Sequence, residues 1–233
     1  METTRTSDSP VVSHRDSAYT TPRPDVFGLV PASAQAILDV GCSNGALGRS
    51  LRAAFPGRQV SGIEFDAKFA AEAATHLDRV IQGDLNSLDW QTQFGARQFD
   101  SIIFADVLEH LVDPARCLKQ ALEHLRHDGS VIVSVPNIRH LSSLRSIFFE
   151  GHFPRRDRGI FDRTHLRWFT IADVHDLLRN SGLRVTGSTP SLRWGDRGGG
   201  RFNRLLNGLP MGAKQFGPVR EFLTYQICLR AAF

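Results

Sequence analysis

Residues 37–48 read ILDVGCSNGALG, an apolar run followed by two closely spaced glycines. An apolar run ends at Val40, which predicts a buried strand followed by a tight turn. Gly41 and Gly45 allow the backbone of that turn to approach a ligand closely. The glycines are spaced G-x-x-x-G, so the turn is neither the dinucleotide fingerprint G-x-G-x-x-G nor a P-loop, which requires Gly-Lys-Ser/Thr.

The same alternation of strand and helix continues along the chain. The pattern predicts strands at 34–41, 59–66, 79–85, 98–108 and 130–137, with helices at 24–30, 46–56, 67–77 and 114–129 between or before them. Alternating strands and helices predict a parallel sheet with helices on both faces, because the crossovers are right-handed.

The pattern changes after the fifth strand. We expect helices over 138–151 and 170–182, strands over 183–192 and 222–233, and a mobile Gly- and Arg-rich loop over about 193–218. Residues 1–21 have no periodic apolar pattern and are expected to be a disordered tail. Residues 22–233 are therefore expected to form a single domain.

The strand ends predict a ligand. Ligands of open α/β sheets bind at the carboxyl ends of the strands. Glu64 ends the second strand, where a carboxylate accepts both hydroxyls of a ribose. Asp84 ends the third strand, where it can accept from an adenine amino group. A glycine turn and two acids on successive strands predict an adenosine-type ligand without phosphates.

These motifs resemble those of class I S-adenosylmethionine-dependent methyltransferases. LDVGCSNGALG is similar to their first motif, GIEFD to the acidic ribose-binding motif and GDL to the adenine-binding motif. The resemblance covers Val26 to the C-terminus, although Ser43 stands where glycine is common. It implies an α/β, Rossmann-like, doubly wound seven-stranded sheet whose last strand is antiparallel, with a helical and loop lid over about 138–170 after strand five.

The resemblance also implies the cofactor S-adenosylmethionine, with S-adenosylhomocysteine as product. The cofactor-binding residues implied by the motifs are Asp39, Gly41, Cys42, Asn44, Gly45, Glu64, Phe65, Asp84, Leu85, Ala105 and Asp106. PRPDVFGLVP and the block SVPN…DRTHLRWFT look like a bacterial subgroup of sugar and natural-product O-methyltransferases. This subgroup is similar to ubiquinone-type and MetW-type proteins.

Two histidines are candidate bases for removing a proton from an alcohol acceptor. His110 follows the fourth strand at the ligand end, and His165 lies in GIFDRTHLRWFT, residues 159–170. In one interpretation this block is a lid, anchored by its large apolar residues, whose polar side chains face the substrate. The substrate-binding residues are then Asp162, Arg163 and Arg167. In the alternative, Asp162 and Arg163 pair with local groups to fix the block, and His165 has only a structural role. His110 also has a structural alternative, in which it merely lies at the start of a helix.

A metal site is also considered. Asp106, Glu109 and His110 form D-x-x-E-H, to which His140 or His165 could add a ligand. Some relatives, such as small-RNA methyltransferases and ubiquinone-type enzymes, hold a divalent metal at a similar E-x-x-E-H. Because Asp106 replaces the first Glu, and D-V-L-E-H-L also occurs in members without metal, we expect no metal here.

Composition limits the other functions. No apolar run approaches the length of a membrane span, and no signal-peptide core is present, so we expect a cytoplasmic protein. Cys42, Cys117 and Cys228 are not spaced like metal ligands, and we expect them to be reduced thiols. Residues 1–135 hold 12 Lys/Arg against 17 Asp/Glu, whereas residues 136–233 hold 16 against 7. The basic half suits a phosphate or carboxylate group, or is a solvated surface.

We expect O-methylation of a small polar acceptor such as a sugar or a glycosylated or phosphorylated intermediate. The alternatives are N- or C-methylation of a natural product, and a MetW-like regulatory partner without turnover. Nucleic acid is not expected as a partner, because no aromatic residues are arranged on a sheet face. Both monomer and homodimer stay open.

Overall fold

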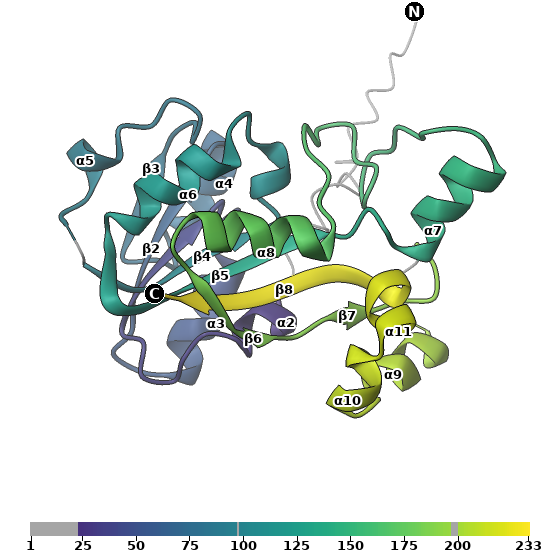
Figure 1. Cartoon of the computed structure of the whole chain (residues 1–233). Helices are drawn as coiled ribbons and strands as arrows, with labels where there is room; N and C mark the ends of the chain where they lie inside the picture. The colour runs from purple at the N-terminus through teal and green to yellow at the C-terminus, as the bar shows by residue number, and fades with distance from the viewer. Residues whose placement is uncertain (1–22, 97, 197–199) are drawn as a thin grey trace, which may run out of the picture.

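The strands form one sheet in the part of the chain that the computed structural model describes, residues 23–96, 98–196 and 200–233. The predicted tail, residues 1–21, lies outside these ranges. Figure 1 shows the sheet crossing the molecule with helices packed on it. The strand order is β3 (Arg79–Gln82), β2 (Gln59–Glu64), β1 (Ala36–Val40), β4 (Phe99–Ala105), β5 (Leu125–Pro136), β8 (Thr224–Ala232) and β6 (Arg184–Ser188).

The last strand runs antiparallel to its neighbours. β1 to β5 pair in parallel, whereas β8 pairs antiparallel with β5 on one side and β6 on the other. The predicted Rossmann-like sheet with an antiparallel last strand is confirmed. The single strand predicted over 183–192 is instead divided, since β7 (Ser191–Leu192) follows Pro190 and pairs with β8 separately. Proline has no N–H to donate, so the sheet pairing is interrupted there.

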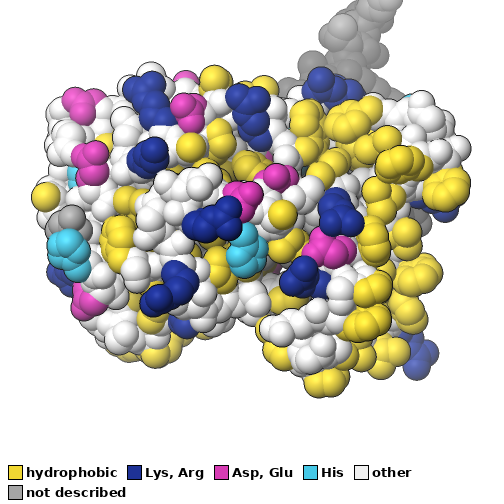
Figure 2. Space-filling model, in the orientation of Figure 1, with side chains coloured by type: hydrophobic (Ala, Val, Ile, Leu, Met, Phe, Trp, Pro, Cys, Tyr) yellow, Lys and Arg dark blue, Asp and Glu magenta, His cyan; other side chains and the backbone are white. Residues whose placement is uncertain are grey.

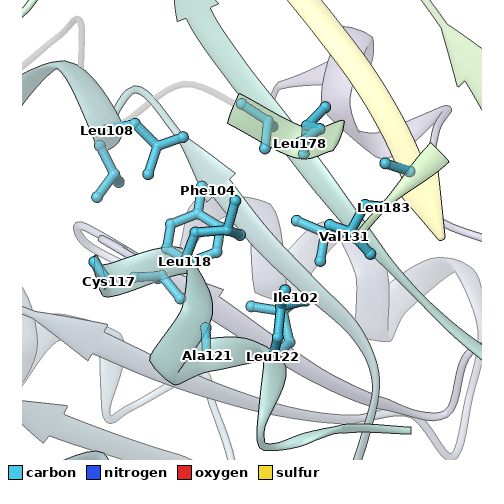
Figure 3. Packing of buried hydrophobic residues seen from close by; sticks show 14 of the residues in the cluster. Ile102, Phe104, Leu108, Cys117, Leu118, Ala121, Leu122, Val131, Leu178 and Leu183 are labelled. Carbon is cyan, nitrogen blue, oxygen red and sulfur yellow. The ribbon is translucent and has the colours of Figure 1, made fainter. Parts of the chain in front are cut away.

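Successive residues of a strand point to opposite sides of the sheet, so apolar side chains lie on both faces. Helices pack on each face and bury them. In β4, Ile102 and Phe104 belong to the buried cluster that α6 and α8 cover, while Ile103 belongs to the cluster under α2 and α3. Figure 3 shows the first cluster from close by, with Leu118 and Leu178 against the strand residues. The helices around the sheet are α2 (Pro24–Phe27), α3 (Ala46–Ala54), α4 (Ala67–Ala73), α5 (Trp90–Gln93), α6 (Pro114–Leu122) and α8 (Ile171–Asn180).

The helix predicted over 114–129 is too long. In the structure α6 ends at Leu122, and β5 already begins at Leu125. Leu125 is fully buried and pairs with Phe99 of β4, ahead of a shift in register. Burial of Leu125 against the neighbouring strand therefore determines the structure of a segment whose local sequence is compatible with a helix.

The segments after β5 contain short helices. Residues 138–170 include α7 (Leu141–Leu144) and the π-helix η2 (Arg145–Phe149), followed by irregular backbone. The segment predicted as a mobile loop contains three short helices, α9 (Arg201–Asn207), α10 (Met211–Gln215) and α11 (Gly217–Leu223). The sequence analysis did not predict these helices. The mobility of residues 193–218 and the role of residues 138–170 as a lid stay predictions.

No helix in the described ranges combines the length and the apolar character that crossing a membrane would require. The three cysteines are buried as free thiols.

Asp39 carries a charge into the buried end of β1. Only 2% of the residue is exposed. Burial, followed by the nearby charge of Glu64, raises the pKa of Asp39 to about 7. The folded protein therefore keeps a proton on Asp39 over a pH range in which the unfolded chain has already released it, near pH ~4.

We predict a pH dependence of stability from Asp39. Between pH ~4 and ~7 the unfolded state binds fewer protons at this residue, so the free energy of unfolding falls as pH rises through the window. The free energy of unfolding of the wild type should fall between about pH 5 and pH 8. Asn at position 39 cannot ionise, so in Asp39→Asn this fall should be smaller by roughly 1–4 kcal/mol. Urea unfolding at both pH values measures this, with the exposed Asp128→Asn as control. Equal losses in wild type and Asp39→Asn would contradict the prediction.

Candidate active site

A cavity of about 740 Å³ opens where β1 to β4 end. Asn44 and Gly45 lie outside its wall: the Asn44 side chain donates to Glu72 at 2.9 Å, and Gly45 precedes α3 with φ 79°. Binding of a cofactor by these residues stays a prediction. The wall contains nine of the eleven residues predicted to bind the cofactor, namely Asp39, Gly41, Cys42, Glu64, Phe65, Asp84, Leu85, Ala105 and Asp106.

The turn after β1 has no room for a side chain at Gly41. Its φ is +73°, and an added Cβ would lie 2.4 Å from Cγ2 of Val107, just beyond β4. The N–H groups of Gly41 and Cys42 both donate to the carbonyl of Ile63, at 2.8 and 3.0 Å. The turn is therefore held against the ends of both neighbouring strands, and its backbone forms part of the cavity wall.

Glu64 fixes the turn from the end of β2. One carboxylate oxygen accepts from the N–H of Ser43 at 2.8 Å, and the other accepts from the N–H of Asp66 at 2.9 Å. Two hydrogen bonds leave further lone pairs on the carboxylate, because an ionised carboxylate offers about four acceptor sites. The side chain is thus oriented by the protein and still able to accept from a ligand.

Two residues at this site have strained backbone. Ser43 has φ 48° and Asp106 has φ 58°, and these are the only residues other than glycine with positive φ in the described ranges. Such conformations are uncommon for residues with a Cβ and cluster at functional sites. Both residues line the cavity, Ser43 after β1 and Asp106 after β4.

Arg23 also lines the cavity, although the sequence analysis gave it no role. Its guanidinium pairs with the carboxylate of Asp106 and donates to Oγ of Ser134 at 2.7 Å. Burial by itself would lower the pKa of Arg23, but the charges of Asp106 and Asp25 raise it. The only sequence signal was the position of this cation before Pro24, where α2 begins.

Glu109 lies behind the β4 end of the cavity. It is 1% exposed, and neither carboxylate oxygen has a hydrogen-bond partner among the described residues. Burial, together with the charge of Asp106, raises the pKa of Glu109 well above its ordinary value. Its backbone carbonyl accepts from the N–H groups of Leu166 and Arg167, so the predicted lid segment is bonded to this strand end.

The two candidate histidines lie together. Their ring centroids are 4.8 Å apart and the rings meet edge to face. Nδ1 of His110 is 3.2 Å from the carbonyl of Thr164, and Nδ1 of His165 is 3.0 Å from the carbonyl of Ile160. A carbonyl only accepts, so in each ring Nδ1 carries the proton and Nε2 is the unprotonated nitrogen. His110 lines the cavity, whereas His165 is 6% exposed and lies outside its wall.

Burial and then the neighbouring His110 lower the pKa of His165, so its ring is neutral at physiological pH. Glu109, His110 and His165 each offer one ligand atom, and these atoms lie within 4.8 Å of one another. A neutral imidazole and a buried carboxylate are common ligands of divalent metals. His140, the other histidine considered, instead bonds to the carbonyl of Arg193 at 2.9 Å.

The predicted substrate-binding residues do not reach the cavity wall. Asp162 is 2% exposed and accepts from the N–H and Oγ1 of Thr164, at 2.9 and 2.7 Å. Arg163 pairs with Asp157 at 2.8 Å, and Arg167 donates to the carbonyl of Val112 at 2.7 Å. These local contacts match the alternative in which the block fixes its own conformation, and a substrate role for its residues stays a prediction.

Comparisons with known proteins agree with this geometry. A family model described as a methyltransferase domain matches residues 12–187. The ubiquinone biosynthesis O-methyltransferase of Hydrogenovibrio crunogenus is 31% identical over 151 residues, which are 63% of this chain and 61% of that protein. The chain thus spans about three fifths of the length of this relative.

Two solved structures share the fold. A SAM-dependent methyltransferase from Thermotoga maritima, described as a possible histamine N-methyltransferase, has a TM-score of 0.61 at 17% identity and covers 94% of this chain and 90% of its own. Magnesium protoporphyrin IX methyltransferase from Synechocystis PCC 6803 with bound SAH has a TM-score of 0.56 at 18% identity, covering 86% and 74%. Because the family model spans most of the sequence and the sheet has the matching topology, the chain belongs to the methyltransferase-domain family, with the fold of S-adenosylmethionine-dependent methyltransferases.

Proposed function

We propose that this chain is a class I S-adenosylmethionine-dependent methyltransferase that methylates an oxygen of a small polar acceptor, such as a sugar or a glycosylated or phosphorylated intermediate. The observation that carries the proposal is one cavity with two chemically different ends. The glycine turn, Glu64 and Asp84 form the end at β1 to β3. His110 and Thr164 form the end at β4.

The first end suits the adenosine part of the cofactor. The remaining lone pairs of Glu64 would accept from the two ribose hydroxyls. One oxygen of Asp84 is bonded to Asn86 at 2.9 Å, and the other would accept from the adenine amino group. Phe65 lines the cavity with 71% of its surface exposed, which gives the adenine ring an apolar face to contact.

The ion pair of Arg23 and Asp106 suits the amino acid part of the cofactor. S-adenosylmethionine carries both a carboxylate and an ammonium group. An arginine binds a carboxylate through two parallel hydrogen bonds, and an aspartate binds an ammonium group. Arg23 would therefore bind the carboxylate of the cofactor, and Asp106 would bind its ammonium group. The ion pair between Arg23 and Asp106 would be replaced by two ion pairs with the ligand.

We predict that Glu64→Gln weakens S-adenosylmethionine binding. The amide keeps the size of the side chain but loses the charge and half of the acceptor sites, so affinity should fall by roughly 1–3 kcal/mol. Isothermal titration measures this, with Glu123→Gln as a matched control on the exposed end of α6. Unchanged affinity in Glu64→Gln would remove the ribose assignment, and equal loss in Glu123→Gln would show a general effect.

His110 is the proposed base because its ring lines the cavity and its Nδ1 faces a carbonyl. His165 would hold the ring of His110 in place through their edge contact. The basic half of the sequence, with 16 Lys/Arg against 7 Asp/Glu, supports an acceptor that carries phosphate. In the alternatives, the acceptor is an amine or carbon of a natural product, or the chain binds cofactor without turnover.

We predict that His110→Ala lowers turnover by about 10²–10⁴-fold while cofactor affinity stays near the wild-type value. His165→Ala should lower turnover less, because His165 acts only on the position of His110. The measurement is methyl transfer to a panel of sugars, sugar phosphates, phenols and amines, with titration of the cofactor in parallel. Transfer only to amines would contradict the O-methylation proposal, and cofactor binding with no transfer would favour the regulatory alternative.

A divalent cation is a second candidate feature, in contrast to the expectation from the sequence. The residues present fit one, because the buried Glu109 carboxylate lacks partners and meets the ligand atoms of His110 and His165 within 4.8 Å. A cation held by these three side chains would stabilise negative charge on an acceptor oxygen. It would also favour the ionised form of Glu109, against which burial acts when no cation is bound.

We predict that a chelator such as EDTA lowers turnover and that added magnesium or zinc restores it. Glu109→Gln should abolish this metal response, because it removes a charged ligand while keeping the size of the side chain. The measurement is methyl transfer together with metal content of the purified protein. Full activity in chelator, with loss confined to His110→Ala, would leave His110 as a base and exclude the metal.

A further inference from the structure

One end of the molecule exposes large apolar side chains at high density. Of the fifteen large apolar side chains that are exposed in the described ranges, ten lie in residues 141–153 and 194–216. We call these two segments the apolar end. Its most exposed residues are Phe149 at 86% and Phe148 at 75%, neighbours at the end of η2. Scattered single exposures are ordinary, whereas a concentration of this kind marks an interaction surface.

Direct contacts hold the two segments together. Oγ of Ser142 donates to Asp196 at 2.7 Å, and immediately before the two segments Nε2 of His140 lies 2.9 Å from the carbonyl of Arg193. Figure 1 shows α7 and α9 to α11 at the same end of the molecule, far from the C-terminus. In Figure 2 the apolar side chains gather at this end, with basic side chains beside them. The segments therefore present one surface rather than two.

The same end carries a large positive charge. The described residues of 139–158 and 193–221, which contain the apolar end and its flanks, hold 10 Lys/Arg and 4 Asp/Glu. Several of these cations have no acidic partner within the described ranges, namely Arg155, Arg158, Arg201, Arg204 and Lys214. A partner of this surface must therefore accept protruding aromatic rings and bring negative charge at once.

We propose that the apolar end docks on the surface of a membrane that contains anionic phospholipids. Aromatic side chains are favoured at the headgroup boundary, and anionic headgroups attract adjacent Arg and Lys. A second copy of this chain fits poorly, because a two-fold interface would set this positive surface against itself. A lipid surface yields to protruding rings such as Phe148 and Phe149, so it needs no matching pocket.

The test is sedimentation of the full chain with vesicles of phosphatidylcholine alone or with phosphatidylglycerol. We expect strong binding only to the phosphatidylglycerol vesicles at low salt, and weaker binding as salt rises. The double variant Phe148→Ser, Phe149→Ser should bind at least about tenfold more weakly, which corresponds to 1.4 kcal/mol. Arg201→Ala with Arg204→Ala should reduce binding to phosphatidylglycerol vesicles. Phe233→Ser, a matched change at the opposite end, should bind like the wild type.

A second measurement reports the orientation of the bound protein. Trp194 is 58% exposed at the apolar end, whereas Trp90 is buried. Vesicles should shift the fluorescence to shorter wavelength, and Trp194→Phe should remove the shift. No binding to phosphatidylglycerol vesicles would overturn the proposal. An equal loss of vesicle binding in Phe233→Ser would also overturn it. So would a wild-type protein that is a dimer and does not bind vesicles, if the double variant Phe148→Ser, Phe149→Ser dissociates that dimer.

Discussion

Close packing between Gly41 and Val107 sets the geometry of the cavity. A Cβ at Gly41 would lie 2.4 Å from Cγ2 of Val107, so the turn after β1 packs against the side chain that follows β4 with no room for a larger residue. In this packing the N–H groups of Gly41 and Cys42 both donate to the carbonyl of Ile63, and the N–H of Ser43 donates to Glu64. The cavity is therefore formed by packing between strand ends, and its polar groups are held before any ligand binds.

The same arrangement gathers negative charge, which the fold must compensate. Asp39, Glu64 and Asp106 lie around one cavity, and Glu109 lies buried behind it. The protein compensates in two different ways. Arg23 neutralises Asp106 with an ion pair, whereas burial raises the pKa of Asp39 and of Glu109 and so favours the uncharged form of each carboxyl group. A ligand with positive charge, such as a sulfonium or a metal ion, would lower the pKa of these carboxyl groups and favour their ionised forms.

The sequence predicted the sheet, and it singled out most of the residues that the structure brings together in the cavity wall, because both depend on local patterns. Apolar runs that end in Gly41, Glu64 and Asp84 identify β1 to β3 and the cavity wall at the same time. Prediction was wrong where tertiary contacts decide, as at Leu125, which pairs with Phe99 and so ends α6 early. Arg23 was missed for a related reason: it meets Asp106, 83 residues away, and nothing near it in the sequence indicates that contact.

The block 159–170 shows how charged and aromatic residues share one segment. Phe161 and Phe169 are buried and anchor the block, whereas Leu166 is 49% exposed and does not. Asp162 turns inward to bond Thr164, and that bond helps to fix the carbonyl of Thr164 that faces Nδ1 of His110. The carbonyl of Ile160 does the same for His165. Both imidazoles are thus oriented by the backbone of one segment, and Asp162 contributes to the site through the position of that backbone.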